Sequence, residues 1–140
     1  MTLEHVNSLC GTAATATMSF DEPGTQSGTD YDSRSCFYDD GASGPPVSAL
    51  RDTFHGGASA AQARFQEDHS ALGGNGTITD LNGPGDAAFY LEDLPTNHAE
   101  IHVVQDEVYV TINDNVVTAQ TAASTMQCLI TLAPEVLAVR

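Results

Sequence analysis

Two histidines, His98 and His102, stand four residues apart in a stretch rich in β-branched and aromatic residues. On one strand their side chains would share a face and lie roughly 13 Å apart, at ~3.3 Å per residue. That separation is too large for a single metal ion to bind both rings. The spacing therefore favours ordinary polar pairs across a sheet, with a titrating groove as the alternative.

The elements that position these histidines are three predicted antiparallel strands within residues 87–113. A two-residue turn at 105–106 places Val103 opposite Val108, so that apolar residues pair with apolar residues. A loop at 93–97 adds the preceding strand and places Phe89 opposite Ile101.

This register predicts one apolar face and one open, polar face. The residues on the open face are Tyr90, Glu92, His98, Glu100, His102 and Tyr109. Because aromatic rings and titratable groups gather there, we expect a ligand-binding surface made of Tyr90, His98, His102 and Tyr109.

The composition excludes two partner classes. Nineteen acidic residues stand against four arginines and no lysine, for a formal net charge of −15. Such a charge argues against nucleic acid and against anionic membrane surfaces. Solubility is the simplest explanation, and a cationic partner or metal ions are the alternative. No run reaches the ~20 apolar residues of a transmembrane segment, and no signal peptide is visible, as in a chain that begins after a removed leader.

Catalytic and cofactor motifs are missing from the sequence. There is no G-x-S-x-G motif, and no carboxylate pair is singled out for glycoside hydrolysis. Residues 80–86 resemble a calcium loop, but Pro84 occupies a ligand position and no Glu follows at the twelfth position. Gly83-x-Gly85 lacks the lysine and the helix of a phosphate loop. We therefore expect no catalytic residue, metal or cofactor.

The flanking segments alternate between helix and strand. Helices are predicted at 2–18, at 59–72 and from about 116, strands at 35–38, 47–54 and 77–81, and loops at 21–32 and 39–46. Ser59 and Gln62 fit a capping box. In the last helix the predicted inner residues are Val116, Ala119, Ala123, Met126, Ile130, Ala133 and Leu137, with Cys128 on roughly the opposite side. Pro134 should kink that helix. The chain is predicted to be one α+β domain over residues 1–140, with a twisted antiparallel sheet covered by helices on one face.

The chain has three cysteines, Cys10, Cys36 and Cys128. Three allow at most one intramolecular disulfide and leave one thiol, and their spacing fits no zinc motif. For Cys128 we consider a buried free thiol, an intermolecular disulfide and a catalytic thiol.

Four short motifs carry a resemblance to a known family. They are residues 7–10 (NSLC), 35–38 (SCFY), 81–88 (LNGPGDAA) and 132–137 (LAPEVL). In this order they resemble a group of uncharacterised small lipoproteins exported by actinobacteria. The resemblance implies export, a Cys10–Cys36 disulfide and an antiparallel sheet backed by helices. Cys128, Pro134 and the missing lipid-attachment cysteine depart from the pattern, and the family supplies no established activity.

We therefore expect a non-enzymatic, secreted or cell-envelope binding or accessory domain, with a small molecule or an envelope protein as its partner. One alternative is a structural subunit of a surface assembly, joined as a homo-oligomer through Cys128 or through an unpaired sheet edge at 47–54. The other is a small-molecule enzyme that uses His98 or His102 as a base.

Overall fold

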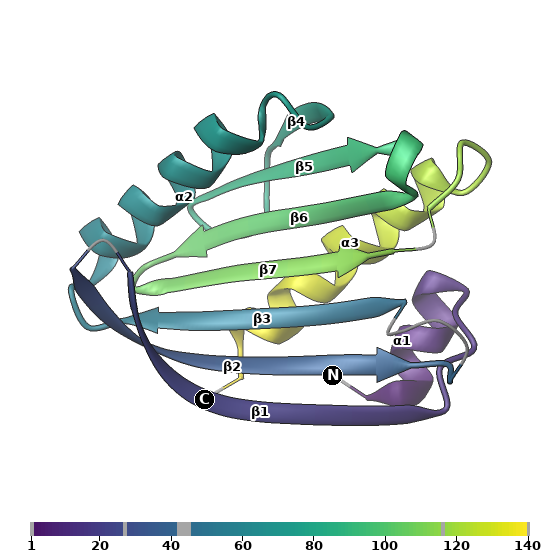
Figure 1. Ribbon diagram of the computed structural model, residues 1–140, viewed down its shortest axis with the longest axis horizontal. Coiled ribbons are helices and arrows are strands. Elements are labelled where there is room, and N and C mark those ends of the chain that lie inside the picture. The colour runs from purple at the N-terminus through teal and green to yellow at the C-terminus, as the bar shows by residue number, and fades with distance from the viewer. Residues whose placement is uncertain (1, 27, 42–45, 116, 140) are drawn as a thin grey trace.

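The computed structural model describes residues 2–26, 28–41, 46–115 and 117–139. Seven strands form one antiparallel sheet in the order β1-β2-β3-β7-β6-β5-β4 (Figure 1). The strands are β1 (Ala16–Gln26), β2 (Thr29–Asp39), β3 (Val47–Phe54), β4 (Thr77–Leu81), β5 (Ala87–Asp93), β6 (His98–Gln105) and β7 (Val108–Asp114). The helices are α1 (Leu3–Cys10), α2 (Ala58–Leu72) and α3 (Ala122–Leu137), with a short 3₁₀ turn at Leu94–Thr96.

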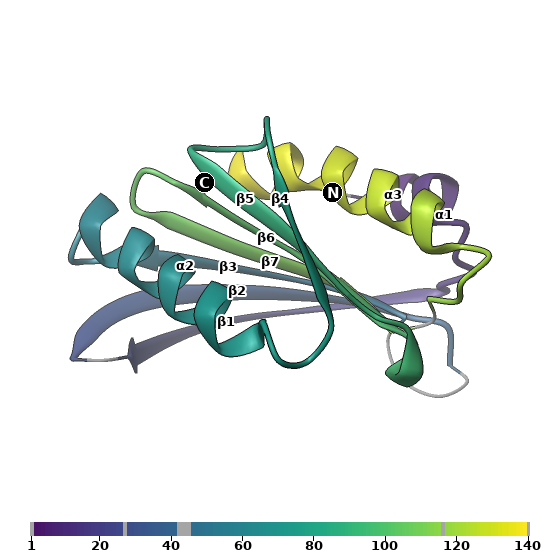
Figure 2. The same ribbon diagram turned by 90° about the horizontal axis from the view of Figure 1, so that it is seen from above.

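The helices lie on both faces of the sheet, as Figure 2 shows. We call the side covered by α1 and α3 the α3 face, and the side covered by α2 the α2 face. Each side has its own buried cluster, with Ile101, Val110 and Leu129 on the α3 face and Phe65, Phe89 and Tyr109 on the α2 face. The α+β class with an antiparallel sheet is confirmed, but the prediction of helices on one face is wrong.

The register explains that difference. The β5–β6 connection spans residues 94–97 rather than 93–97, with Asn97 in the left-handed region at φ 56°. As a result Phe89 lies opposite His102, and Tyr90 lies opposite Ile101. This one-residue difference sends Phe89 to the α2 face and Tyr90 to the α3 face, so β5, β6 and β7 do not form the predicted open polar face.

The β6–β7 hairpin differs by two residues and therefore keeps its faces. Its turn falls at residues 106–107, where Asp106 adopts φ 50°. Val103 pairs with Val110, and Ile101 pairs with Ile112. Two of the observed pairs are apolar, but Ala99 lies opposite Asp114 and Val108 lies opposite Gln105, so the pairing of apolar residues alone did not give the correct turn.

The N-terminal third departs most from prediction. Helix α1 is capped by the Thr2 side chain and ends at Gly11, whose φ of 66° suits glycine, so the predicted helix over 2–18 is too long. The predicted loop at 21–32 is instead the end of a β1–β2 hairpin of two 11-residue strands. Strand β3 lies between β2 and β7, so the predicted sheet edge at 47–54 is wrong; the edges are β1 and β4.

Helices α2 and α3 also depart from prediction in detail. Helix α2 is where it was predicted, but Gly57 stands at its N-cap, and Ser59 donates to the Gly56 carbonyl instead of forming a capping box. Helix α3 begins at Ala122, about six residues later than predicted, and contains Pro134. Its buried residues are Thr125, Cys128, Leu129, Leu132, Ala133 and Val136, and Met126, Ile130 and Leu137 pack half-buried against the same core. The predicted inner face is therefore confirmed for these three and Ala133, and wrong for the exposed Ala119 and Ala123. The predicted start at Val116 and half of the predicted loop at 39–46, namely residues 42–45, fall outside the described residues.

The disulfide joins Cys10 of α1 to Cys128 of α3, and Cys36 on β2 is a half-buried free thiol. The Cys10–Cys36 pairing implied by the family resemblance is therefore wrong, and so is an outward-facing Cys128, which is 2% exposed. The bond fastens both helices over the same side of the sheet. None of the helices in the described part of the chain is long and apolar enough to span a membrane.

Replacing Cys10 and Cys128 with alanine should lower the free energy of unfolding by about 2–5 kcal/mol, because the bond closes a loop across 118 positions of sequence. Cys36→Ala should change it by less than about 1 kcal/mol. Urea unfolding measures both variants. A non-reducing peptide map that links Cys36 to either other cysteine would contradict this pairing.

Candidate functional site

A groove of about 420 Å³ opens on the α2 face, between α2 and the strands β2, β3, β7 and β6. Its lining residues are Ser35, Phe37, Ser48, Ala49, Leu50, Arg64, Asp68, Leu72, Glu100, His102, Thr111 and Asn113. The volume falls within the roughly 300–1,000 Å³ range of small-molecule sites. Most of the titratable groups that the structure buries on this face line the groove or lie directly behind it.

The polar wall is built on β6 by Glu100 flanked by two histidines. Alternate residues of a strand share a face, so His98, Glu100 and His102 all point toward the α2 side. The His98 Nε2 atom lies 3.4 Å from Glu100 Oε2, and His102 Nε2 lies 3.1 Å from Glu100 Oε1. The His102 contact is close, but its angle is too bent for a good hydrogen bond. One carboxylate thus joins two histidines that are too far apart to meet directly.

A second chain of contacts leads from His102 toward α2. His102 Nδ1 contacts the Tyr109 hydroxyl, which donates a 2.7 Å hydrogen bond to Asp68 Oδ2. Arg64 Nη2 lies 3.0 Å from the same Asp68 oxygen, one helical turn away on α2. The network therefore connects the sheet to the helix through partly buried contacts, of which those to Asp68 are charge-assisted.

Aromatic packing fixes the orientation of His102. Its ring stacks on Phe89, with centroids 4.4 Å apart and planes 11° from parallel. Phe65 of α2 packs against both Phe89 and Tyr109. A ring held between a stacked neighbour and polar contacts at both nitrogens has little freedom to rotate, so the polar wall is preorganised.

The electrostatics keep Glu100 ionised. Burial raises the pKa of Glu100, but its contacts with His102 and His98 outweigh burial and lower the pKa to about 2. The contact with Glu100 raises the pKa of His98, helped by the Asn115 side chain, whose Oδ1 lies 2.8 Å from His98 Nδ1. Burial and the hydrogen bond to Asp68 raise the pKa of Tyr109, which stays protonated as a donor.

The opposite wall of the groove is apolar. Phe37 of β2, Leu50 of β3 and Leu72 of α2 line it. Leu50 is 37% exposed, which is unusual for a leucine in the middle of a central strand. Phe20 and Met18 on β1 extend the apolar surface beyond the groove, with exposures of 48% and 46%.

Asp52 is a buried carboxylate that the sequence interpretation missed. It lies on β3 opposite Tyr109 and is 5% exposed, and its Oδ1 has no hydrogen-bond partner among the described residues. Burial raises its pKa, and the hydroxyl of Ser33 and the charge of Arg64 oppose the rise. The alternation of residues along β3 could have placed Asp52 on the face of Tyr109, but only with the strand order known.

The structure separates the four residues predicted as one ligand-binding surface. Tyr90 lies in the α3-face core at 3% exposure, and burial raises its pKa to about 12. Tyr109 is on the α2 face but is 2% exposed beneath α2. His102 lines the groove, and His98 lies four residues away on the same strand, outside the lining. The predicted open sheet face is therefore wrong, and His102 belongs to a groove covered in part by α2.

The arrangement suits binding better than proton transfer. Both ring nitrogens of His102 contact protein groups, and so do both of His98. A general base needs a nitrogen that reaches the substrate proton. No group of three or more His, Cys, Asp or Glu side chains suited to a metal ion occurs in the described ranges.

Comparison of the chain with models of protein families, with curated proteins and with solved structures finds no match. The functional conclusion therefore rests on the geometry of the groove.

The contacts of Glu100 with His98 and His102 should make the stability of the protein depend on pH. The pKa of Glu100 is lower in the folded than in the unfolded chain, so its stabilisation is present above pH ~4.5 and is lost as pH falls toward about 2. His98 has a raised pKa, so its contribution is present below pH ~6.5 and is lost as pH rises through the folded value. The difference in unfolding free energy between wild type and Glu100→Gln should therefore peak between about pH 4.5 and 6.5.

The shift of Glu100 sets an upper bound of about 3 kcal/mol on that peak. Urea unfolding from pH 2 to pH 9 measures the difference. Parallel pH profiles for the two proteins would show that these ion pairs do not form.

Tyr109→Phe should destabilise the protein by about 1–3 kcal/mol, because Asp68 and His102 lose the hydroxyl between them. Tyr31→Phe is the matched control, since Tyr31 also packs on a phenylalanine and its hydroxyl makes no hydrogen bond within the described ranges. The control should change stability by less than about 0.5 kcal/mol. Equal effects in thermal unfolding would contradict a network that depends on Tyr109.

Proposed function

We propose that this protein is a non-enzymatic, secreted or cell-envelope binding or accessory domain, and that the α2-face groove holds its ligand. The observation that carries this proposal is the pairing of two unlike walls. Leu50 and Phe37 leave apolar surface exposed on one side of the groove, and Glu100 and His102 present fixed polar groups on the other. Pockets with mostly apolar walls and a few placed polar groups are typical of small-molecule sites.

The charges favour a neutral or cationic ligand that is partly apolar. Glu100 is ionised throughout the physiological pH range. Asp68 is matched by Arg64, and Glu100 gives the groove negative character wherever its two histidine neighbours are neutral. The net charge of −15 acts in the same direction, because it repels anions and attracts cations at long range.

Two observations support the binding function over the alternatives. Both ring nitrogens of His98 contact protein groups, and His102 is only 3% exposed, which disfavours an enzyme that uses either as its base. Neither feature that suggested a subunit of a surface assembly is present, since Cys128 lies in an intramolecular disulfide and β3 is a central strand.

An oxidising location accords with the Cys10–Cys128 bond, because disulfides persist outside the reducing cytosol. The resemblance to exported actinobacterial lipoproteins supports the same location. We therefore place the proposed ligand in the extracellular space or the cell envelope.

A fragment screen by ¹⁵N chemical-shift perturbation tests the function. Neutral or cationic amphiphilic fragments should shift the amides of Leu50, Thr111 and Asn113, and their anionic counterparts should not. Leu50→Gln should weaken binding about 5–10-fold, since it removes roughly 1 kcal/mol of apolar contact.

Met18→Gln is the control, because Met18 is exposed on the same face but does not line the groove. It should leave the affinity unchanged. Fragments that shift no groove amide, or that bind Leu50→Gln and wild type equally, would overturn the assignment.

A further inference from the structure

A second cavity, of about 210 Å³, lies on the α3 face where the C-terminal end of α3 approaches β1, β2 and β3. Its lining residues are Ser19, Arg34, Cys36, Tyr38, Ala49, Arg51, Val136 and Val139. The α2-face groove opens on the other side of the sheet. The chemistry of this cavity also differs, because it contains two of the four arginines in the chain.

Arg34 and Arg51 are directly opposite each other across β2 and β3. Residues paired in this way lie on the same face of the sheet, with Cβ atoms about 5 Å apart. Like charges at such positions destabilise a sheet. The chain has nineteen acidic residues, and one of them in place of either arginine would have removed this repulsion.

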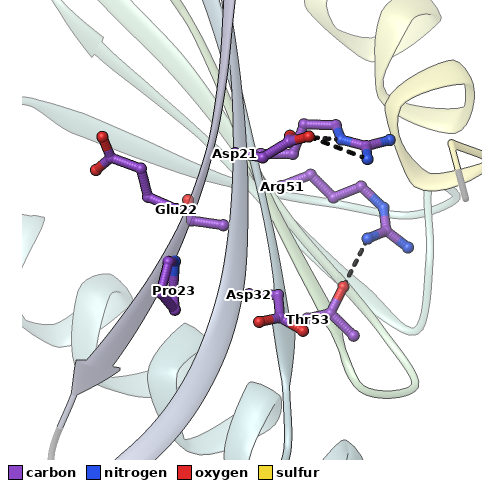
Figure 3. Close-up of a pocket in the computed structure, with 8 residues that line it drawn as sticks. Asp21, Glu22, Pro23, Asp32, Arg51 and Thr53 are labelled. Carbon is purple, nitrogen blue, oxygen red and sulfur yellow. Dashed lines mark hydrogen bonds and ion pairs between the residues drawn. The ribbon is translucent and has the colours of Figure 1, made fainter.

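The two arginines differ in how their charge is matched. Arg34 Nε lies 2.8 Å from Asp21 Oδ1, an ion pair at the surface. Arg51 has no carboxylate within 4 Å among the described residues, and its Nη1 donates a 2.6 Å hydrogen bond to the Thr53 hydroxyl. Figure 3 shows Arg51, Asp21 and Thr53 on one side of the ribbon, with Glu22 pointing to the other.

The Nε atom of Arg51 is buried and has no hydrogen-bond partner within the described ranges. Burial and the neighbouring Arg34 lower the pKa of Arg51, and the negative charge of Glu107 opposes them only in part. A buried donor without a partner is costly, and a guanidinium presents paired donors that match a carboxylate. An anion beside the guanidinium would compensate the positive charge of Arg51.

The other residues that line the cavity indicate which groups, besides an anionic one, the ligand carries. Val136, Val139 and Ala49 make the cavity apolar away from the guanidinium groups. Its volume lies below the roughly 300 Å³ at which sites for drug-sized molecules begin, so the ligand is small. Asp21 and Asp32 lie beside the arginines and would oppose a doubly charged phosphate more than a single carboxylate.

We propose that the α3-face cavity binds a small aliphatic carboxylic acid, with the carboxylate on Arg51 beside Arg34 and the alkyl chain against Val136 and Ala49. This site is independent of the α2-face groove, which favours neutral or cationic molecules. The protein thus has two binding sites of opposite charge preference, one on each side of the sheet.

Cys36 provides a direct readout of occupancy. It lines the same cavity and is the one cysteine outside the disulfide, so its alkylation by N-ethylmaleimide under non-reducing conditions reports access to the cavity. Hexanoate at saturating millimolar concentration should slow this alkylation at least fivefold, on the order of 1 kcal/mol of protection. Hexanol at equal concentration should slow it less than twofold.

Variants separate the charge from the shape of the cavity. Arg51→Gln should remove the protection by hexanoate, and Arg51→Lys should retain part of it through its charge. Leu50→Gln, on the opposite face, should retain all of it, so a failure here is distinguishable from a failure of the groove. Circular dichroism checks that each variant is folded, and the wild-type comparison of hexanoate with hexanol stands without any variant.

The proposal is overturned if hexanoate gives no protection, or if hexanol protects equally, since the cavity would then be merely apolar. Protection by inorganic phosphate equal to that by hexanoate would also overturn it, because the site would bind any anion. Protection by hexanoate that survives in Arg51→Gln would place the carboxylate elsewhere.

Discussion

The stacking of His102 on Phe89 is the contact on which the α2 side of the molecule depends. It exists because β5 and β6 pair with Phe89 opposite His102. On the same face, alternation along β6 places Glu100 between two histidines, and the β6–β7 pairing places Tyr109 under Asp68 of α2. A shift of one residue in either pairing would move Phe89 or Tyr109 to the other face, so fold and groove are specified together.

The sequence predicted the strands better than their pairing. Residues 87–113 form three strands because their β-branched and aromatic runs suit a sheet. Their register was ambiguous because both faces are covered by helices, so Phe89 and Tyr90 are both core residues and neither marks an outer face. Alternation of polar and apolar residues identifies a face only when the other face meets solvent.

Two further features could not be predicted for different reasons. The β1–β2 hairpin has the glycine, threonine, serine and aspartate composition of a loop, and it is held mainly by backbone pairing rather than by a core. The Cys10–Cys128 bond joins segments 118 positions apart, which no local pattern reveals. Glu100 was predicted to share a face with both histidines, but its contacts with them, the buried Asp52 and the exposed Leu50 required the structure.

The central claim is that the α2-face groove is a ligand site, and native mass spectrometry tests it most directly. The protein would be isolated, without reducing agent, from the cells that make it and measured beside Leu50→Gln prepared in the same way. We predict a monomer two hydrogens lighter than the reduced chain, with a neutral or cationic small molecule that is depleted in the variant. A wild-type protein that carries no added mass under gentle ionisation, or a ligand retained equally by the variant, would contradict the account.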